Sequence, residues 1–267
     1  MIPTFALILA GGNGSRAGAA TSFGKALPKQ FLRLGSPSGL PMFISAAAVF
    51  AEISDITEIV VVLPEAFVTF GESLLAEYSE SLHGKKITVI PGGANRNESL
   101  RRGAEYLQSL QSLNGCDAEK TVVLTHDAAR PFVTAEIIRA NIAAVSSGEC
   151  RACTTAVPVK DTVFFAVPEA VSGAGNSTRN NSVSAIPDRR QIYLAQTPQT
   201  FTLGLLAETF ARLEDTDVSG FTDACGLVRA AFPPNELGTE IRIVPGDYRN
   251  VKITDGFDVE LYGKVNT

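Results

Sequence analysis

An apolar run over residues 6–10 leads directly into the glycine-rich turn 11–14, and this junction limits the fold more than any other feature of the chain. The run has the length and composition of a buried strand. Glycines lack a Cβ atom, so the backbone N–H groups of such a turn can approach a ligand closely and form a nest of donors suited to phosphate. Arg16 and Lys29 follow and would face the same anion. The sequence therefore predicts a nucleotide triphosphate site after the first strand.

Apolar runs with strand character alternate along the chain with stretches of helical periodicity. This alternation predicts an α/β fold with a mostly parallel, doubly wound, Rossmann-like sheet. Ligands of such sheets lie beyond the carboxyl ends of the strands, where the glycine turn, Gly92-Gly93 and His126-Asp127 would converge. We expect strands over residues 6–10, 58–63, 86–90, 121–125 and 153–159, and helices over residues 40–51 and 97–111 and from Thr134 onward.

Residues 158–190 interrupt the alternation of strand and helix patterns. Two short apolar stretches, 163–165 and 182–186, flank a segment rich in Gly, Ser and Asn. The pattern predicts a two-stranded arm with a long tip, inserted in a single domain that spans residues 1–267. Such an arm cannot bury its own apolar face, which favours a role in dimerisation. The alternative is a surface loop without such a role.

Composition limits the partners and the compartment. A net charge of −5 and a sequence pI near 5.2 argue against nucleic acid as the main partner, because binding to its backbone needs a basic face. No apolar run reaches the length of a membrane span, and the N-terminal residues lack the pattern of a signal peptide, so we expect a cytoplasmic protein. Cys150 and Cys153 form a C-x-x-C without a second pair, which favours reduced thiols over a zinc or redox site.

The glycine turn alone is compatible with more than one class of site. It is not a P-loop, because the G-x-x-x-x-G-K-[ST] pattern is absent. Residues 12–17 come close to a dinucleotide fingerprint, but no clear helix and no acidic residue follow at the expected places. The remaining possibility is a nucleotidyltransferase loop, in which the turn wraps the triphosphate and Pro28-Lys29 closes over it.

Six segments in order resemble one family. LAGGNGSRAG…PKQF, GGANRNESL, THDAARPF, AQTPQTF, TDAC and NVKIT are similar to segments of the cytidylyltransferases that act on methylerythritol 4-phosphate or ribitol 5-phosphate. The resemblance extends from about residue 5 to residue 260. It implies a Rossmann-like homodimer, joined through the arm, that uses Mg²⁺ and transfers CMP from CTP to a small polyol phosphate with release of pyrophosphate.

The resemblance also implies a role for particular residues. Arg16 and Lys29 match the catalytic cations, and Asp127 matches the metal ligand. Residues matching Thr162 and Arg189 reach across from the partner subunit. The segments that bind CTP correspond to Ala10, Gly11, Gly12, Asn13, Gly14, Gly93, Arg96 and Ser99, and those that hold the acceptor correspond to Thr162, Arg189, Thr222 and Lys252.

Several of these positions have a simpler explanation. Asn97 would cap a helix, and Asp127 would form a salt bridge with Arg130. His126 is expected to be a packed residue rather than an acid–base catalyst, because an ionised acceptor phosphate needs no general base. The segment containing Arg249 and Lys252 departs from the methylerythritol branch, which has Asp-Asn-Ile-Lys where this chain has RNVK.

The missing aspartate leaves the second metal contact open, with Asp247 as a weak substitute. The segments GGxxRN, THDAxRPF and TDAC favour ribitol 5-phosphate slightly as the acceptor. Two other classes stay open from the sequence. One is an NAD(P)-dependent oxidoreductase that uses the glycine turn, and the other is a non-catalytic nucleotide-binding or assembly protein, suggested by Arg249.

Overall fold

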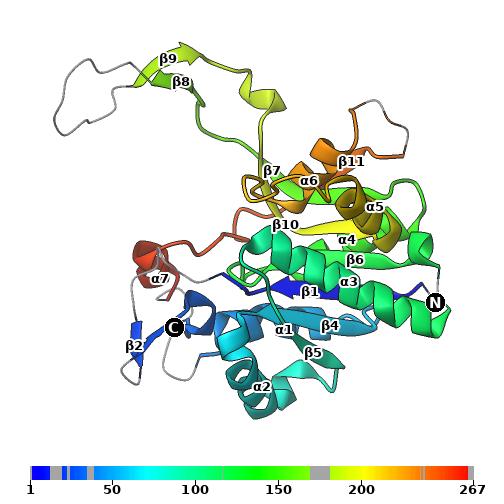
Figure 1. Ribbon diagram of the computed structural model, residues 1–267. Coiled ribbons are helices and arrows are strands. Elements are labelled where there is room, and N and C mark those ends of the chain that lie inside the picture. The colour runs from blue at the N-terminus through cyan, green and yellow to red at the C-terminus, as the bar shows by residue number, and fades with distance from the viewer. Residues whose placement is uncertain are drawn as a thin grey trace.

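The computed structural model describes residues 2–12, 20–22, 25–34, 39–115, 117–168, 181–234, 236 and 238–263. Its centre is a seven-stranded sheet with helices on both faces (Figure 1). In chain order the strands of this sheet are β1 (Thr4–Leu9), β4 (Glu58–Leu63), β5 (Ile87–Pro91), β6 (Val122–Asp127), β7 (Ala152–Pro158), β10 (Tyr193–Thr202) and β11 (Ile241–Pro245). A separate two-stranded sheet contains β2 (Ala20–Ser22) and β3 (Lys25–Leu27).

The strand order across the sheet is β11-β7-β10-β6-β1-β4-β5. β1 pairs in parallel with β4 and with β6, and β4 with β5 and β11 with β7 are also parallel pairs. β10 runs antiparallel to β6 and β7. The predicted mostly parallel sheet is therefore confirmed, and its strand order reverses beside β1. At such a reversal the two following connections diverge and leave a crevice at the carboxyl ends of the strands.

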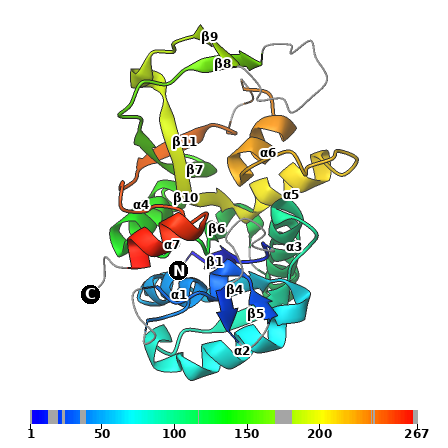
Figure 2. The ribbon, with the colours of Figure 1, turned by 90° about the vertical axis from the view of Figure 1, so that its left-hand side faces the viewer.

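The helices lie in two layers. α1 (Met42–Ala51), α2 (Val68–Glu77) and α4 (Ala135–Ser146) cover one face, and α3 (Arg96–Asn114), α5 (Leu203–Arg212) and α6 (Ala224–Ala231) cover the other. α7 (Gly256–Gly263) lies beside the edge that carries the carboxyl ends of the strands (Figure 2).

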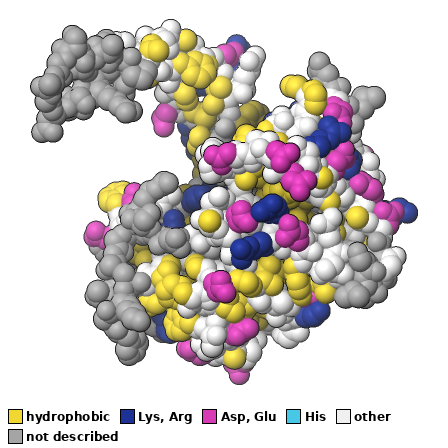
Figure 3. Space-filling view, viewed as in Figure 1, with side chains coloured by type: hydrophobic (Ala, Val, Ile, Leu, Met, Phe, Trp, Pro, Cys, Tyr) yellow, Lys and Arg dark blue, Asp and Glu magenta, His cyan; other side chains and the backbone are white. Residues whose placement is uncertain are grey.

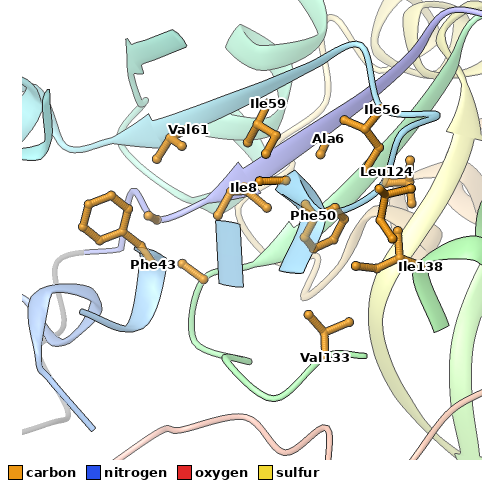
Figure 4. Close-up of a cluster of buried hydrophobic side chains, with 14 of the residues drawn as sticks. Ala6, Ile8, Phe43, Phe50, Ile56, Ile59, Val61, Leu124, Val133 and Ile138 are labelled. Carbon is orange, nitrogen blue, oxygen red and sulfur yellow. The ribbon is translucent and has the colours of Figure 1, made fainter. Parts of the chain in front are cut away.

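The alternation of side chains along β1 accounts for the two layers. Ala6 and Ile8 pack on one face against Phe43, Phe50 and other apolar residues (Figure 4). The intervening Phe5 and Leu7 point to the opposite face, where they join the cluster around α3 and α5. Because neighbouring residues of a strand point to opposite faces, a strand that is apolar at every position must be buried on both sides. This requirement makes the run an unambiguous signal for the centre of the sheet.

The start of α3 differs from the expectation. The prediction that Asn97 caps this helix is wrong, because Asn95 Oδ1 accepts the Glu98 backbone N–H at 2.9 Å. Asn97 instead donates its amide hydrogens to the carbonyls of Val218 and Phe221, at 2.6 and 2.7 Å. Asn97 therefore anchors a distant loop. The helix expected from Thr134 onward is confirmed, and Thr134 caps it, since its hydroxyl accepts the Ile137 N–H at the start of α4.

The arm is a pair of antiparallel strands, β8 (Phe165–Pro168) and β9 (Asn181–Ala185), which extends away from the body of the molecule (Figures 1 and 2). The two-stranded prediction is thus confirmed, although residues 163–164 precede the strand, and the tip falls outside the described residues. Apolar side chains gather on the arm (Figure 3). More than half of the surface of each of the following is exposed: Phe164, Phe165, Val167, Val183 and Ile186.

Two further observations concern membranes and thiols. Among the described residues, no helix is both long and apolar enough to cross a bilayer. Cys150, Cys153 and Cys225 carry free thiols. Burial raises the pKa of Cys153 and of Cys225 to about 12, which disfavours the reactive thiolate and agrees with the expected structural role.

Candidate functional site

A cavity of about 330 Å³ opens at the carboxyl ends of β1 and β6. The structure brings eight of the expected site residues to its wall: Ala10, Gly11, Gly12, Lys29, Arg96, Ser99, Asp127 and Lys252. Leu9, Gln30, Ala128, Ala129 and Thr254 complete the lining. The cavity therefore coincides with the crevice that the strand order predicts, and it joins segments from both halves of the chain.

Asp127, the last residue of β6, is the acidic group of this cavity. Its Oδ1 accepts hydrogen bonds from Arg96 Nε and Nη2, at 3.1 and 3.0 Å, and its Oδ2 accepts one from Lys252 Nζ at 2.8 Å. Burial alone would raise the pKa of this carboxyl, but the charges of Arg96 and Lys252 outweigh it and hold the pKa far below its usual value. Asp127 is thus ionised, with its charge neutralised by two cations.

The expected salt bridge from Asp127 to Arg130 is wrong. The Arg130 guanidinium donates instead to two backbone carbonyls, Asn250 O at 2.8 Å and Ala195 O at 3.1 Å. Arg130 therefore ties the segment that carries Lys252 to β10.

A series of hydrogen bonds through Thr197 and His126 holds the backbone of Asp127 in place. The Asp127 backbone N–H donates to Thr197 Oγ1 at 3.1 Å, and this hydroxyl lies 3.0 Å from His126 Nδ1. His126 Nε2 lies 3.0 Å from the Arg130 carbonyl. Because a carbonyl only accepts, Nε2 must carry the proton, and Nδ1 then accepts from Thr197. Burial lowers the pKa of His126 to about 4, so the ring is neutral at pH 7 and holds Asp127 in place, as expected of a packed residue.

Cations from three separate segments face the cavity. Lys29, in the short helix Lys29–Phe31, donates its ammonium to the carbonyl of Ile253 at 2.9 Å, so it is held by the chain just before α7. Arg96 stands at the start of α3, and Lys252 follows β11. Among the described residues, Arg96 Nη1 is buried without a hydrogen-bond partner. Three cations beside one carboxylate make the wall suited to a ligand with several negative charges.

Ser99 connects the glycine turns to α3. Its hydroxyl donates to the Asn95 carbonyl at 2.9 Å and accepts the Gly93 N–H at 3.1 Å. A Cβ atom on Gly11 would lie only 2.7 Å from Ser99 Oγ, so a side chain at position 11 would force the two segments apart. Gly93 itself does not line the cavity and contributes by fixing Ser99. This arrangement places the Ser99 oxygen beside the main chain of Gly11 in the cavity wall.

Three expected acceptor residues lie away from the cavity. Thr162 and Arg189 are exposed at the base of the arm, where Arg189 donates to the Lys160 carbonyl at 2.9 Å. Thr222 is exposed on the loop before α6, and the adjacent Asp223 caps that helix by accepting the Gly226 N–H at 2.8 Å. Asn13, Gly14 and Arg16 fall outside the described residues.

Asp247 does not replace the missing aspartate of the segment at 249–252. Its carboxylate is 2.6 Å from the Arg249 guanidinium, whose hydrogen bonds lower the pKa of Asp247 to about 2, and Asp247 does not line the cavity. Asp127 is therefore the carboxylate at the cavity wall that can hold a metal. A single carboxylate beside cations that could hold phosphates fits Mg²⁺, which takes oxygen ligands and binds through one or two carboxylates together with substrate phosphates.

Sequence reasoning assigned no role to Gln30, which is buried in the cavity wall. Its Nε2 donates to the carbonyls of Ala10 and Gly12, at 2.6 and 3.0 Å. The sequence signal was its place between Lys29 and Phe31, but a polar residue in a short surface helix is ordinarily exposed. Its burial became visible only in the fold.

A doubly wound sheet with a cationic cavity at its strand reversal, built on a glycine turn, defines a nucleotide-binding α/β protein. A profile described as IspD, 2-C-methyl-D-erythritol 4-phosphate cytidylyltransferase, matches residues 4–262, and the chain belongs to this family. It is accordingly a CTP-dependent cytidylyltransferase. Membership of this family sets aside both the oxidoreductase and the non-catalytic alternative.

Individual relatives agree with this assignment. The chain is 35% identical, over 96% of its own length and 95% of the relative's, to a ribitol-5-phosphate cytidylyltransferase of Lactiplantibacillus plantarum. A 4-diphosphocytidyl-2C-methyl-D-erythritol synthase structure from Anaerococcus prevotii shares the fold, with a TM-score of 0.72 and 22% identity over 98% of this chain and 94% of that one. The Thermus thermophilus 2-C-methyl-D-erythritol 4-phosphate cytidylyltransferase superposes with a TM-score of 0.64 at 25% identity, over 98% and 97% of the two chains.

Proposed function

We propose that this protein transfers CMP from CTP to ribitol 5-phosphate, forming CDP-ribitol and releasing pyrophosphate. The observation that carries the choice of acceptor is the 35% identity, over nearly the full length of both chains, to a ribitol-5-phosphate cytidylyltransferase. Arg249, where the methylerythritol branch has aspartate, supports the same choice. Methylerythritol 4-phosphate is the second candidate, because the family profile and the related solved structures carry its name.

In this reaction an ionised oxygen of the acceptor phosphate attacks the α-phosphorus of CTP in line. The new P–O bond forms as the bond to the β-phosphate bridge breaks, and pyrophosphate leaves. Lys29 and Arg16 stabilise the negative charge on the oxygens of the α-phosphate, since catalysis of such transfers consists mainly of positioning and electrostatic stabilisation. No general base is required, which agrees with a His126 that is neutral and bonded on both ring nitrogens.

Asp127 would hold a Mg²⁺ ion, which supplies additional positive charge to the triphosphate. Arg96 and Lys252 occupy three acceptor positions of this carboxylate, so a carboxylate with about four of them keeps one for a further ligand. The same two cations would also contact phosphate oxygens. Arg96 is the better placed of the two, because its Nη1 is buried and unpaired among the described residues.

The cytosine ring would lie at the end of the cavity near Ser99. The Ser99 hydroxyl hydrogen is committed to the Asn95 carbonyl, so its oxygen can only accept a hydrogen bond from a ligand. The exocyclic amino group of cytosine is a donor, whereas the corresponding oxygen of uracil is an acceptor. Ser99 would therefore favour CTP over UTP.

The acceptor site would be completed by a second subunit. Thr162 and Arg189 lie at the base of the arm and away from the cavity of their own subunit, while the arm exposes an apolar face that includes Phe165 and Val183. A homodimer joined through the arms would bury this face and place the partner's copies of Thr162 and Arg189 beside Thr222 and Lys252. The cytoplasm is the expected location, since the cysteines of the described residues are free thiols.

The test is a steady-state assay of pyrophosphate release with CTP and Mg²⁺, comparing ribitol 5-phosphate with methylerythritol 4-phosphate. We expect kcat/KM to be at least tenfold higher for ribitol 5-phosphate, with CDP-ribitol identified by mass spectrometry. A reaction without acceptor is the blank for CTP hydrolysis. A preference for methylerythritol 4-phosphate would overturn the choice of acceptor, and no turnover with either compound would overturn the proposed reaction.

A further inference from the structure

The side chain of Gln30 crosses from the segment of Lys29 to the glycine turn. Gln30 is 4% exposed, and its Nε2 donates one hydrogen to the Ala10 carbonyl at 2.6 Å and the other to the Gly12 carbonyl at 3.0 Å. Both partners are carbonyl oxygens, so only the amide nitrogen can face them. The orientation of the amide is therefore fixed by chemistry.

These two bonds determine where the main chain of the turn points. A peptide group is planar and trans, so its C=O and the N–H of the next residue point in opposite directions. The Ala10 C=O and the Gly11 N–H belong to the same peptide group. Because the Ala10 carbonyl points toward the Gln30 amide, the Gly11 N–H must point away from it. Among the described residues none accepts a hydrogen bond from this N–H, and Gly11 lines the cavity. The N–H is thus left for a ligand.

Among the described residues, the other contacts of residues 10–12 do little to hold this orientation without Gln30. The Ala10 N–H donates to the Val62 carbonyl at 2.9 Å, which fixes only the start of the turn. Gly11 approaches Ser99 closely, but glycine itself permits many backbone angles. A turn rich in glycine needs an external contact to hold one conformation, and two hydrogen bonds from a single amide group provide it.

Gln30 also joins this turn to Lys29. The two residues are neighbours in the short helix Lys29–Phe31, which Phe31 anchors in the core beside Phe43. Lys29 is held on its other side by the Ile253 carbonyl. The distance between the ammonium of Lys29 and the N–H of Gly11 is therefore set through the backbone of residues 29–30 and the side chain of Gln30.

We infer that Gln30 is a positioning residue, whose amide orients the main chain of residues 10–12 toward the triphosphate and fixes it relative to Lys29. This inference rests on the proposed binding of CTP in the cavity. It concerns the phosphate part of the ligand, because Ser99, although Gly11 lies against it, is held in place by its own contacts with Asn95 and Gly93 and not by Gln30.

The experiment compares wild type with Gln30→Met, which keeps the length of the side chain and removes both donors. CTP affinity is measured by calorimetry, and cytidine affinity by its competition with CTP. We expect Gln30→Met to weaken CTP binding at least tenfold and cytidine binding less than threefold. A general disturbance of the cavity would weaken both ligands alike, so the ratio of the two affinities is the readout that separates orientation from structural damage.

Lys85→Met is the matched control. Lys85 Nζ also holds two main-chain carbonyls, those of Ile53 and Ile56 at 2.9 and 2.8 Å, but outside the cavity. Its loss is expected to leave both affinities unchanged. Should Gln30→Met unfold, Gln30→Asn, which keeps the amide on a shorter side chain, serves in the same comparison and is expected to weaken CTP in the same selective way.

The outcomes separate this inference from the proposed function. If wild type fails to bind CTP, the proposed function fails. If wild type binds CTP and the Gln30 variants bind it equally well, or lose CTP and cytidine in equal proportion, the positioning role is overturned.

Discussion

Replacing Asp127 with asparagine should destabilise the ligand-free protein measurably at neutral pH. The carboxylate accepts three hydrogen bonds from two cations, and the substitution removes the negative charge while keeping the shape. Breaking a fully buried ion pair costs about 3–5 kcal/mol. Here the side chains of Arg96 and Lys252 are 23% and 39% exposed, so water can solvate part of the freed charge, and the asparagine oxygen still accepts one bond.

We therefore expect a loss of about 2 kcal/mol, below the range for a fully buried pair because of this exposure. In a chain of this size that corresponds to a fall of roughly 4–6 °C in Tm. The assay is thermal unfolding followed by circular dichroism at pH 7. Glu149→Gln is the control, since Glu149 pairs with Arg242 at 2.6 Å on the surface, where both side chains are about half exposed, and its loss should not change Tm.

The pH dependence gives a second readout with a defined sign. The pKa of Asp127 is lower in the folded protein than in the unfolded chain, where an aspartate titrates at about 3.9. Its contribution to stability is thus complete above about pH 5 and is lost as the pH falls further toward the folded pKa. The difference between wild type and variant should shrink below about pH 4. If the Asp127→Asn variant were as stable as wild type at pH 7, the electrostatic account of this site would be refuted.

Three further predictions concern the ligands and the arm. Lys29→Ala should lower kcat by about 10²–10³-fold, the typical effect of removing one group that stabilises the transition state, while the Kd of CTP changes less than tenfold; wild-type turnover would exclude the catalytic role of Lys29, and Arg16→Ala is tested in the same way. Ser99→Ala should reduce the ratio of kcat/KM for CTP over UTP at least tenfold, and an unchanged ratio would show that Ser99 does not read the base. Phe165→Glu combined with Val183→Glu should convert a dimer into folded monomers in sedimentation velocity and abolish turnover, whereas an active monomer would rule out a shared acceptor site.

Part of this site can be predicted from sequence because it is encoded by adjacent residues. The apolar run of β1 and the turn after it occupy one continuous segment, and the position of Asp127 at the end of β6 follows from the buried strand before it. Parallel strands then bring both to one edge of the sheet. The local sequence pattern and the general topology of parallel sheets are therefore enough to predict the glycine turn and Asp127 at the same edge.

The partners of Asp127 could not be predicted in this way. Lys252 is 125 residues away from Asp127. Its segment is held beside the carboxylate by contacts between distant parts of the chain, among them those of Arg130 and Asn250 with β10. Arg130 is the nearer cation in the sequence, but its guanidinium is used on carbonyls. Charge pairs inside a fold depend on which side chains the packing leaves facing each other, and sequence separation says little about this.

The same limit applies to helix caps and to Gln30. Asn95 and Asn97 are equally suited to capping by residue type, and the choice depends on the loop at 218–221, which takes the Asn97 amide. Gln30 is polar and lies in the short helix Lys29–Phe31, so its burial against residues 10–12 carries no local signal. In both cases a contact between distant segments decides the role.

The central claim is that the cavity at the ends of β1 and β6 binds CTP, with its triphosphate among the cations. A crystal structure of the complex with CTP and Mg²⁺ tests this most directly. The account predicts phosphate oxygens in contact with the Gly11 N–H, Lys29 and Arg96, the metal on Asp127, and the cytosine amino group beside Ser99. A triphosphate bound elsewhere, or bound in this cavity with its base at the Lys29 end, would contradict it.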